Sequence, residues 1–179
     1  MPAIGKYLLI FLLMICVSSS SALAWGGLGH RTVAAIALLL IPEKAAKIEA
    51  ILAHLEMDGD FVDAGAYPDE FIRDHDWGHK FDAWHFAALP DDGTPFVCGE
   101  CLLKVLPAQL AIMRQGGGGK AEAVAIAWVE DLVGDLHQPL RMDARLRGGS
   151  LFHVSYRGIK ACDDFSKKDP KFNLQKVWE

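Results

Sequence analysis

Hydrophobic and polar residues follow one another along much of this chain with the spacing of helices. Apolar residues dominate residues 30–40, and Pro42, which a helix interior does not tolerate, ends this predicted helix. Residues 42–55 repeat apolar positions at helical spacing and predict a second helix. Two more helices are predicted over residues 101–115 and 120–140, and the last of them is the longest.

Weaker patterns lie between and after these helices. The glycines at 116–119 predict a break between the last two helices. Residues 67–73 predict a short helix start, and residues 81–90 predict an extended or irregular segment. Residues 147–158 begin with turn glycines and continue with alternating apolar and polar positions, which favours a short strand or hairpin. The sequence thus predicts a mainly α fold with a small β-hairpin.

Residues 1–24 predict a signal peptide that does not belong to the fold. One basic residue, Lys6, precedes a short apolar run, and small residues follow it up to Ala24. The run is shorter than the roughly 20 apolar residues that a membrane-spanning helix needs, so an uncleaved anchor is the minor alternative. We therefore expect a secreted or periplasmic protein that is cleaved before Trp25, has no membrane attachment afterwards and forms a single domain over residues 25–179.

The overall charge limits the class of partner. The chain has 18 basic and 23 acidic residues, and its formal net charge is −5. Binding of duplex DNA draws on many Lys and Arg contacts with phosphates, so an acidic chain is not typical of that class. A metallo-hydrolase remains open, because bound metal ions would supply the positive charge.

The cysteine pattern indicates a disulfide. Cys16 lies in the predicted signal peptide, which leaves Cys98, Cys101 and Cys162. Export favours disulfides, but the odd count leaves open whether Cys98 and Cys101 pair with each other or one of them pairs with Cys162. A zinc ribbon would need a second closely spaced pair of cysteines, which the sequence lacks.

Two carboxylates on the longest predicted helix are candidates for a metal site. Asp131 and Asp135 are four residues apart in a mostly apolar stretch, and this spacing places them on one face of the helix. Two like charges on a buried helix repel each other and are costly to desolvate, and a cation between them would remove this cost. The spacing leaves equally open that one carboxylate faces solvent or pairs with Arg31 or Arg141.

Other polar residues in apolar surroundings have two interpretations each. His30 opens the first apolar helix and is either a helix-start residue or a ligand. Asp69 lies where aspartate often caps a helix, and His85 lies between aromatic residues, where a buried core histidine is the commoner case. His137 lies two residues past Asp135 and points away from its face. None of these residues is decisive by itself.

Together, the stretches that contain these residues resemble a known family. In chain order they are WGGLGH, AGAYPDEFIR, AWHFAALP, LVGDLHQPL, RGGS and NLQKVWE. They are similar to the successive motifs of zinc-dependent single-strand nucleases of the S1/P1 type, whose helical fold zinc-dependent phospholipase C enzymes share. The resemblance covers nearly all of residues 25–179 and implies a helical domain of this type. Family members continue past the position of Glu179, so we expect their C-terminal helices to be missing from this chain.

The resemblance implies two zinc sites. After processing, Trp25 would bind one zinc ion through its amine and backbone carbonyl together with His30, and Asp135 would bridge this ion to a second. The second zinc ion would have four ligands: Asp69, His85, Asp131 and Asp135. In the mechanism of the family, paired zinc ions activate a water molecule, and Asp69 orients this water or accepts its proton.

The sequence departs from the family pattern at a third zinc site. The positions of its ligands hold Arg141, Gln175 and Glu179, and an always-protonated guanidinium cannot bind a metal ion. Asp131 also stands where the family has histidine. We therefore expect that the third zinc ion is lost and that the guanidinium of Arg141 contacts the substrate phosphate instead.

The predicted function is a secreted zinc-dependent endonuclease that hydrolyses single-stranded DNA and RNA to products with a 5′-phosphate. Stacking of unpaired bases in a cleft would give the single-strand preference. The altered third site leaves open a catalytically impaired relative that binds metal or nucleic acid. The shared fold leaves open a hydrolase of the phospholipase C type. If the chain is complete, we expect a monomer.

Overall fold

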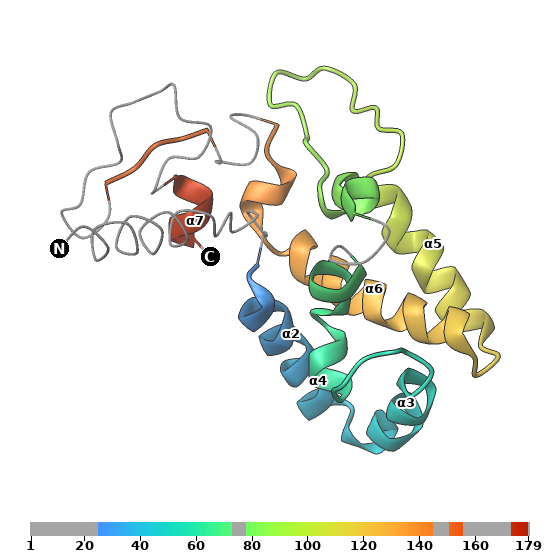
Figure 1. The fold of residues 1–179 in the computed structure, drawn as a ribbon. Coiled ribbons are helices and arrows are strands. Elements are labelled where there is room, and N and C mark those ends of the chain that lie inside the picture. The colour runs from blue at the N-terminus through green and yellow to red at the C-terminus, as the bar shows by residue number, and fades with distance from the viewer. Residues whose placement is uncertain (1–24, 73–77, 145–150, 156–172, 179) are drawn as a thin grey trace, which may run out of the picture.

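The computed structural model describes residues 25–72, 78–144, 151–155 and 173–178 of the 179-residue chain. Helices dominate these ranges, and the predicted mainly α fold is confirmed (Figure 1). None of the helices in the described ranges is long and apolar enough to cross a membrane. The predicted signal peptide, residues 1–24, lies outside the described residues.

The long helix α6, Lys120–Leu136, lies at the centre of the fold (Figure 1). Helix α5, Leu102–Gln115, runs along one side of it. Helices α2, Gly27–Leu40, and α3, Ala45–Leu52, contact α6 from the other side. The short helix α4, Phe61–Ala64, contacts α2, α3 and α6. Every helix that surrounds α6 therefore packs against it.

Proline and glycine set the helix ends that the sequence predicts. Helix α2 ends at Leu40, and a 3₁₀ turn, Pro42–Lys44, leads into α3. The helix predicted over 42–55 is thus this turn followed by α3. Between α5 and α6, the first three glycines of 116–119 have φ angles of 70°, 125° and 67°. Residues with side chains disfavour these angles, so the glycines break the chain between the two helices.

Helix α6 is shorter than the predicted segment, which extended to residue 140. It ends at Leu136, and Pro139 opens a separate 3₁₀ turn, Pro139–Met142. The side chain of Gln138 is buried between the two, and its Oε1 accepts a hydrogen bond from the backbone N–H of Leu140 at 2.5 Å. The chain therefore turns sharply at the end of α6.

The segment 81–90, which the sequence predicts to be extended or irregular, is helical in its first half. A 3₁₀ helix spans Gly78–His85, and Leu89 beyond it forms a parallel bridge with Asp143. Aromatic side chains of this 3₁₀ helix pack on α6. This packing comes from a distant part of the chain, so the local pattern could not reveal the helix.

Two short helical elements precede the 3₁₀ helix. Helix α4 begins at a capping box, in which the side chain of Asp60 accepts hydrogen bonds from two backbone N–H groups at 2.8 and 3.2 Å. Asp63 completes the box by accepting a bond from the N–H of Asp60 at 3.4 Å. A π-helical turn, Pro68–Ile72, follows where the sequence predicts a helix start over 67–73.

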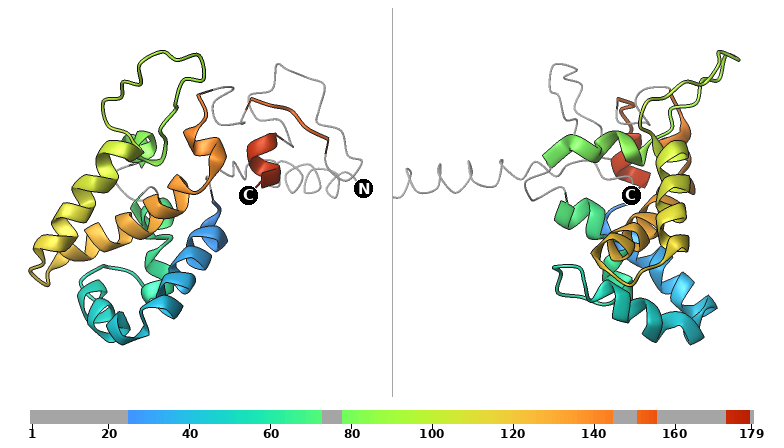
Figure 2. Two further views of the ribbon diagram at one scale, coloured as in Figure 1. Left: turned by 180° about the vertical axis from the view of Figure 1, so that it is seen from behind. Right: turned by 90° about the vertical axis from the view of Figure 1, so that its right-hand side faces the viewer.

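The predicted hairpin over 147–158 is described only at residues 151–155. There, His153 forms an isolated antiparallel bridge with Asn173, which precedes the short helix α7, Leu174–Trp178. Figure 2 shows α7 to one side of the helices that surround α6. The rest of the predicted hairpin lies outside the described residues.

A disulfide joins Cys98 and Cys101 directly before α5. This is one of the pairings that the sequence left open. Cys162 lies outside the described residues. The disulfide closes a short turn at the end of the segment that connects the 3₁₀ helix to α5.

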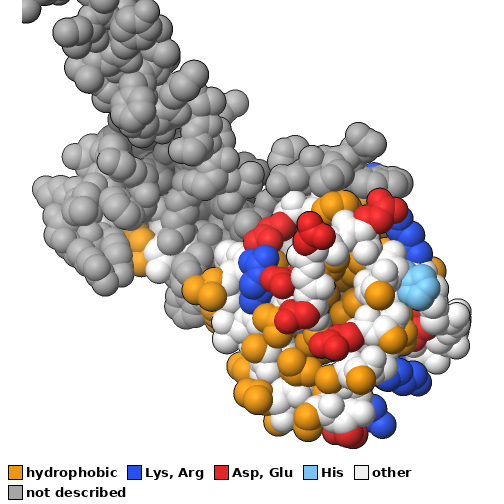
Figure 3. Space-filling view, turned by 60° about the horizontal axis from the view of Figure 1, so that its bottom comes forward, with side chains coloured by type: hydrophobic (Ala, Val, Ile, Leu, Met, Phe, Trp, Pro, Cys, Tyr) orange, Lys and Arg blue, Asp and Glu red, His pale blue; other side chains and the backbone are white. Residues whose placement is uncertain are grey.

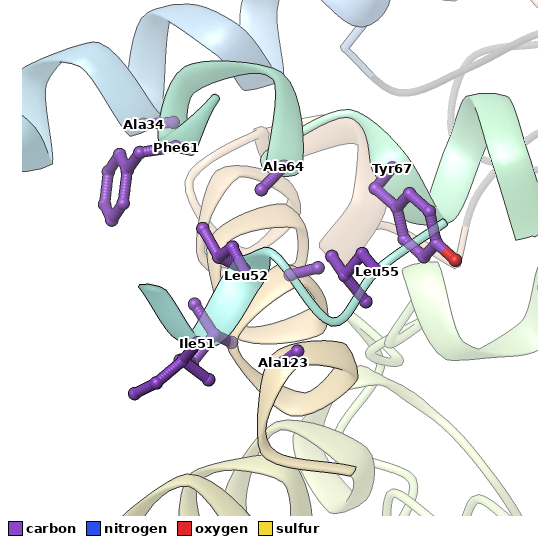
Figure 4. Packing of buried hydrophobic residues seen from close by; sticks show 10 residues of the cluster. Ala34, Ile51, Leu52, Leu55, Phe61, Ala64, Tyr67 and Ala123 are labelled. Atoms are coloured by element: carbon purple, nitrogen blue, oxygen red, sulfur yellow. The ribbon is translucent and has the colours of Figure 1, made fainter. Parts of the chain in front are cut away.

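Two hydrophobic clusters pack on α6. The first lies between α2, α3, α4 and α6 (Figure 4) and consists of Ala34, Ile51, Leu52, Leu55, Phe61, Ala64, Tyr67, Ala123, Ile126 and Ala127. The second lies between α5, α6 and the 3₁₀ helix and consists of Ala87, Leu102, Val105, Leu106, Trp128 and Leu132. Burial on two sides removes most of α6 from water, so a polar residue on it needs a partner inside the protein.

The outer side of α2 is apolar and exposed. Leu28, Leu39 and Leu40 are 81%, 79% and 75% exposed within the described structure. Figure 3 shows one face of the molecule, on which hydrophobic side chains reach the surface among acidic ones. Helix α2 thus has apolar side chains on its outer side as well as on the side that packs on α4 and α6.

Glu130 of α6 has a buried carboxylate. Both of its carboxylate oxygens are buried and have no hydrogen-bond partner among the described residues. Burial raises the pKa of Glu130 to about 8. The folded protein therefore favours the protonated form of this side chain.

We expect Glu130→Gln to stabilise the protein at neutral pH. The Glu130 pKa is about 8 in the folded chain against 4.5 when unperturbed, so stability falls as the pH rises from about 4.5 through 8. An amide does not ionise, so the variant should gain roughly 1–3 kcal/mol of unfolding free energy at pH 7.5 and little at pH 4. Urea unfolding at both pH values measures the difference. Glu49→Gln, on the exposed side of α3, is the control, and a gain that does not depend on pH would contradict this account.

Candidate metal centre

His30 lies in the first turn of α2 with its imidazole fully buried against α6. Two glycines allow this close packing. A Cβ added at Gly134 of α6 would lie 3.0 Å from Nδ1 of His30. A Cβ added at Gly65 would lie 3.0 Å from both the backbone oxygen of His30 and the Cβ of Ala34. The absence of side chains at these two positions therefore lets the His30 segment sit deep in the fold.

The π-helical turn and the 3₁₀ helix bring Asp69 and His85 to His30. Oδ2 of Asp69 lies 3.4 Å from Nε2 of His30. Nε2 of His85 lies 3.8 Å from Oδ1 of Asp69. The ring of His85 packs on Trp128 of α6, with 5.4 Å between ring centroids. His85, Asp69 and His30 thus converge from three separate elements.

Asp131 and Asp135 meet these imidazoles from α6, and both carboxylates are fully buried. Nδ1 of His85 lies 2.7 Å from Oδ2 of Asp135 and 3.1 Å from Oδ2 of Asp131. Nδ1 of His30 lies 3.5 Å from Oδ1 of Asp131, and its Nε2 lies 3.7 Å from Oδ1 of Asp135. Both carboxylates therefore contact both imidazoles. We call these side chains the carboxylate–imidazole cluster: His30, Asp69, His85, Asp131 and Asp135.

Two overlapping groups of the cluster fit a metal ion. Potential ligand atoms of His30, Asp69 and Asp131 lie within 4.8 Å of one another, as do those of His85, Asp131 and Asp135. Several buried atoms have no hydrogen-bond partner in the described structure: both ring nitrogens of His30, both carboxylate oxygens of Asp131, Oδ2 of Asp69 and Oδ1 of Asp135. Such atoms are costly to bury, and imidazole nitrogens and carboxylate oxygens are ligands of zinc. The donor set therefore suits a bound cation of this kind.

Trp25 lies next to the cluster. Its indole Nε1 donates a hydrogen bond to the backbone oxygen of Gly134 at 2.7 Å. A Cβ added at Gly29 would lie 2.7 Å from the Cβ of Trp25, so the two residues pack closely. Gly134 also packs against the imidazole of His30. Trp25 and His30 therefore contact the same residue of α6. A ligand role for the amine of Trp25 depends on cleavage after Ala24 and stays a prediction.

Protons on the imidazoles balance part of the carboxylate charge. Burial alone would lower the pKa of His30, but the carboxylates of Asp131, Asp69 and Asp135 outweigh it and raise this pKa to about 9. Burial would also lower the pKa of His85, which Asp131 and Asp135 raise well above its usual value. Burial raises the pKa of Asp131 to about 6, against the opposing effect of both imidazoles. A metal ion and protons would compete for the same atoms.

Arg141 is buried beside the cluster. Its Nε lies 3.5 Å from Oδ1 of Asp135. Its guanidinium carbon lies 4.0 Å from the ring centroid of Phe86, which is the spacing of a cation–π contact. The backbone oxygen of Arg141 accepts a hydrogen bond from Ala87 at 3.0 Å, which holds the Pro139–Met142 turn against the chain that follows His85. The alternative pairing of an α6 carboxylate with Arg141 is therefore present for Asp135.

Two other expectations concern residues outside the cluster. Arg31, an alternative partner for the α6 carboxylates, instead pairs with Asp63 at 2.8 Å and with Glu70 at 2.6 Å. His137 is exposed, and its Nδ1 lies 2.7 Å from the backbone oxygen of Val133. Neither residue belongs to the candidate metal centre.

The remaining third-site positions lie in or after α7. The amide side chain of Gln175 is buried. Glu179 lies outside the described residues. Of the three positions, Arg141 is therefore the one for which the structure describes a contact with the cluster.

Three residues around the site do not stand out in the sequence analysis. Trp128 supports His85, Phe86 lies against Arg141, and Gly134 makes room for His30. A signal exists for Gly134, because a glycine inside a helix costs about 1 kcal/mol relative to alanine and indicates close packing. The sequence has no comparable signal for the contacts of Trp128 and Phe86.

Comparison with known proteins identifies similar sequences. The model of a family described as S1/P1 Nuclease matches residues 25–179. The chain is also similar to Nuclease S1 of Aspergillus oryzae (strain ATCC 42149 / RIB 40), with 26% identity over 168 residues. This alignment covers 87% of the chain and 53% of the relative, so the chain spans about half the length of the curated relative that it matches.

We expect Asp135→Asn to weaken zinc binding at least tenfold. Asp135 contributes to one of the two groups and contacts both imidazoles, and a neutral amide is a poorer zinc ligand than a carboxylate. Titration of the chain that starts at Trp25 with zinc, in competition with a chelating indicator, measures the affinity.

Asp63→Asn is the matched control for this variant. Asp63 pairs with Arg31 and lies outside the cluster, so its variant should bind zinc as the unmodified chain does. Thermal unfolding with and without zinc gives a second readout, since a ligand that binds only the folded state raises Tm. Equal zinc affinity in Asp135→Asn and the unmodified chain would show that the cluster does not hold the metal.

Proposed function

The chain belongs to the S1/P1 nuclease family, and we propose that it is a secreted enzyme that hydrolyses phosphodiester bonds in single-stranded DNA and RNA. The observation that carries the proposal is the carboxylate–imidazole cluster, whose buried donor atoms converge from four elements and in part lack hydrogen-bond partners among the described residues. A structural core does not need such an arrangement, whereas a metal-dependent hydrolase does.

Two zinc ions are proposed to bind at the cluster. His30 and Asp135, with the amine and carbonyl of a processed Trp25, would hold one ion, and Asp135 would be shared with the second. The second ion would have four ligands: Asp69, His85, Asp131 and Asp135. Bound zinc ions would supply Lewis acidity and would lower the pKa of a water molecule in the site.

Asp69 is the proposed proton acceptor. Burial would raise its pKa, but the nearby imidazoles of His30 and His85 lower it, so the carboxylate is ionised at neutral pH. Its Oδ2 is buried and has no hydrogen-bond partner among the described residues. In the proposed step, the water oxygen bonds to phosphorus, a proton of the water passes to Asp69, the P–O3′ bond breaks, and the leaving 3′ oxygen takes up a proton from solvent. The products carry a 5′-phosphate and a 3′-hydroxyl.

Arg141 is proposed to bind a non-bridging phosphate oxygen in place of a third zinc ion. The guanidinium is permanently charged and buried between Asp135 and Phe86, so it is a fixed cation beside the reacting phosphate. A guanidinium cannot act as a Lewis acid. We therefore expect the reaction to be slower than it would be with a third metal ion. Gln175 occupies another ligand position of the third site, and its amide is a weak ligand for zinc. Its presence supports the loss of that ion.

Secretion is proposed from two features of the chain. Residues 1–24 have the pattern of a signal peptide, whose removal would create the free amine of Trp25. The disulfide between Cys98 and Cys101 is of a kind that persists in oxidising compartments.

A second candidate is a relative that binds zinc or nucleic acid without efficient catalysis. Arg141 and Gln175 favour it, because neither can replace the Lewis acidity of a metal ion. Measurements of strand cleavage and of zinc content separate the two candidates.

The chain that starts at Trp25, loaded with zinc, is expected to cut single-stranded DNA and RNA and to leave duplex DNA mostly intact. A chelator should abolish cleavage, and the products should carry 5′-phosphates. Elemental analysis should give two zinc ions per chain. A folded, zinc-loaded chain that cuts neither substrate would support the binding relative instead, and three zinc ions per chain would contradict the loss of the third site.

Arg141→Ala should lower kcat/KM on single-stranded DNA by about 10- to 1,000-fold, because the variant loses a charge that stabilises the transition state. Arg141→Lys should retain part of the activity, and both variants should keep two zinc ions. Arg114→Ala, on the exposed side of α5, is the control. Unchanged kcat/KM in a folded Arg141→Ala variant would rule out the proposed contact with the phosphate.

A further inference from the structure

The disulfide turn before α5 bonds to both chain neighbours of His85. Figure 1 shows the chain leaving the 3₁₀ helix in a long loop and returning to it where α5 begins. There, Oε2 of Glu100 accepts a hydrogen bond from the indole N–H of Trp84 at 3.1 Å. The backbone N–H of Leu102 donates a hydrogen bond to the backbone oxygen of Phe86 at 2.9 Å. One bond therefore holds the residue before His85, and the other holds the residue after it.

The disulfide fixes the turn that makes these contacts. Gly99 and Glu100 are the two residues between Cys98 and Cys101. Cys101 is the N-cap residue of α5, and its backbone oxygen accepts a hydrogen bond from the N–H of Lys104 at 2.9 Å. The side chain of Lys104 also donates a hydrogen bond to the backbone oxygen of Cys98. Both ends of the turn are therefore tied to the first turn of α5.

The loop before the turn gives Glu100 little support of its own. Residues 91–95 are all exposed, and Glu100 itself is exposed. A hydrogen bond at the surface contributes little when the chain that carries its acceptor has to be ordered at the same time. The disulfide closes the turn whether or not this bond is formed, so ordering the Glu100 carboxylate beside Trp84 costs less entropy.

The contacts of the turn lead to the carboxylate–imidazole cluster through the aromatic neighbours of His85. The ring of Trp84 packs on Trp128, with 4.8 Å between the ring centroids, and Trp128 also supports the ring of His85. On the other side, Phe86 lies against the guanidinium of Arg141. Groups that orient a metal ligand from outside typically change metal affinity by about 10- to 100-fold when they bond to the ligand directly. The turn acts one residue further away, so its effect should be smaller.

We propose that the Cys98–Cys101 turn positions His85 for metal binding. The turn holds both chain neighbours of His85, so that the imidazole keeps its place beside the carboxylates of α6. Glu100 is a positioning residue, because it acts through Trp84 and not as a ligand. The inference rests on the proposed function for its metal site and adds to it a structural support whose effect is on zinc affinity.

Two variants of Glu100 separate its hydrogen bond from its charge. Glu100→Ala removes the acceptor, whereas Glu100→Gln removes the charge but keeps an oxygen that can accept the bond from Trp84. The chain that starts at Trp25 is titrated with zinc in competition with a chelating indicator. We expect Glu100→Ala to weaken zinc binding about three- to tenfold and Glu100→Gln to change it less than twofold. Glu43→Ala, at an exposed position of the turn before α3, is the control.

The double variant Cys98→Ser/Cys101→Ser tests the disulfide and leaves no thiol in the turn that could bind zinc. It should also weaken zinc binding about three- to tenfold. Adding Glu100→Ala to it should cost less than a further twofold, because both changes release the same contact. Cobalt(II) in place of zinc gives a visible absorption that depends on ligand geometry. This absorption should change in Glu100→Ala and in the double variant but not in Glu100→Gln. Circular dichroism of the metal-free chains checks that the variants are folded.

The outcomes separate this proposal from the proposed hydrolysis. Unchanged zinc affinity or cobalt absorption in a folded Glu100→Ala chain overturns the positioning role, whether or not the unmodified chain cuts DNA. Equal losses in Glu100→Ala and Glu100→Gln would assign the effect to charge and would overturn it as well. A chain that shows the expected dependence of zinc affinity but cuts no strand keeps the positioning role and overturns the hydrolysis. An unmodified chain that binds no zinc overturns both.

Discussion

Three buried carboxylates, those of Asp69, Asp131 and Asp135, set the condition that the surrounding helices have to meet. Carboxylates that lose their water must gain opposite charge, and in this chain the charge comes from His30 and His85 on two other elements. The raised imidazole pKa values show how strongly the carboxylates act on them. Contact between these groups restricts how α2, α6 and the two irregular helical elements can pack on one another. A bound cation would satisfy the same need with more charge.

Most helices could be predicted from the sequence because their signals are local. Apolar spacing and the flanking prolines and glycines mark α2, α3, α5 and α6 within a few residues. The 3₁₀ helix Gly78–His85 was missed, because packing of its aromatic side chains on Trp128 stabilises it from about 45 residues away in the sequence. The predicted end of α6 at residue 140 is too late. The helix ends at Leu136, and the side chain of Gln138 accepts a hydrogen bond from the Leu140 N–H in the turn that follows.

The candidate site was predictable only in part from physical reasoning. The common face of Asp131 and Asp135 follows from helical spacing. The convergence of His30, Asp69 and His85 on that face depends on tertiary packing, and only the resemblance to a family brought these residues together. For Arg141, the sequence left pairing with α6 and a role at the substrate phosphate open, and its contact with Asp135 is compatible with both. The close fit of His30 on Gly134 follows from packing that a one-dimensional pattern does not contain.

The hydrogen bond from Trp25 to Gly134 joins positions that are 109 residues apart and closes the N-terminal segment onto α6. Contacts of such long sequence separation form late in folding, because the chain entropy of the intervening segment has to be lost first. The donor atoms of the cluster likewise come from residues between His30 and Asp135, so a chain that is synthesised or translocated only in part has no complete place for a metal ion. If the proposed secretion precedes folding, the ion would be taken up at the destination. The metal content of the folded chain would then reflect the medium outside the cell rather than the supply within it.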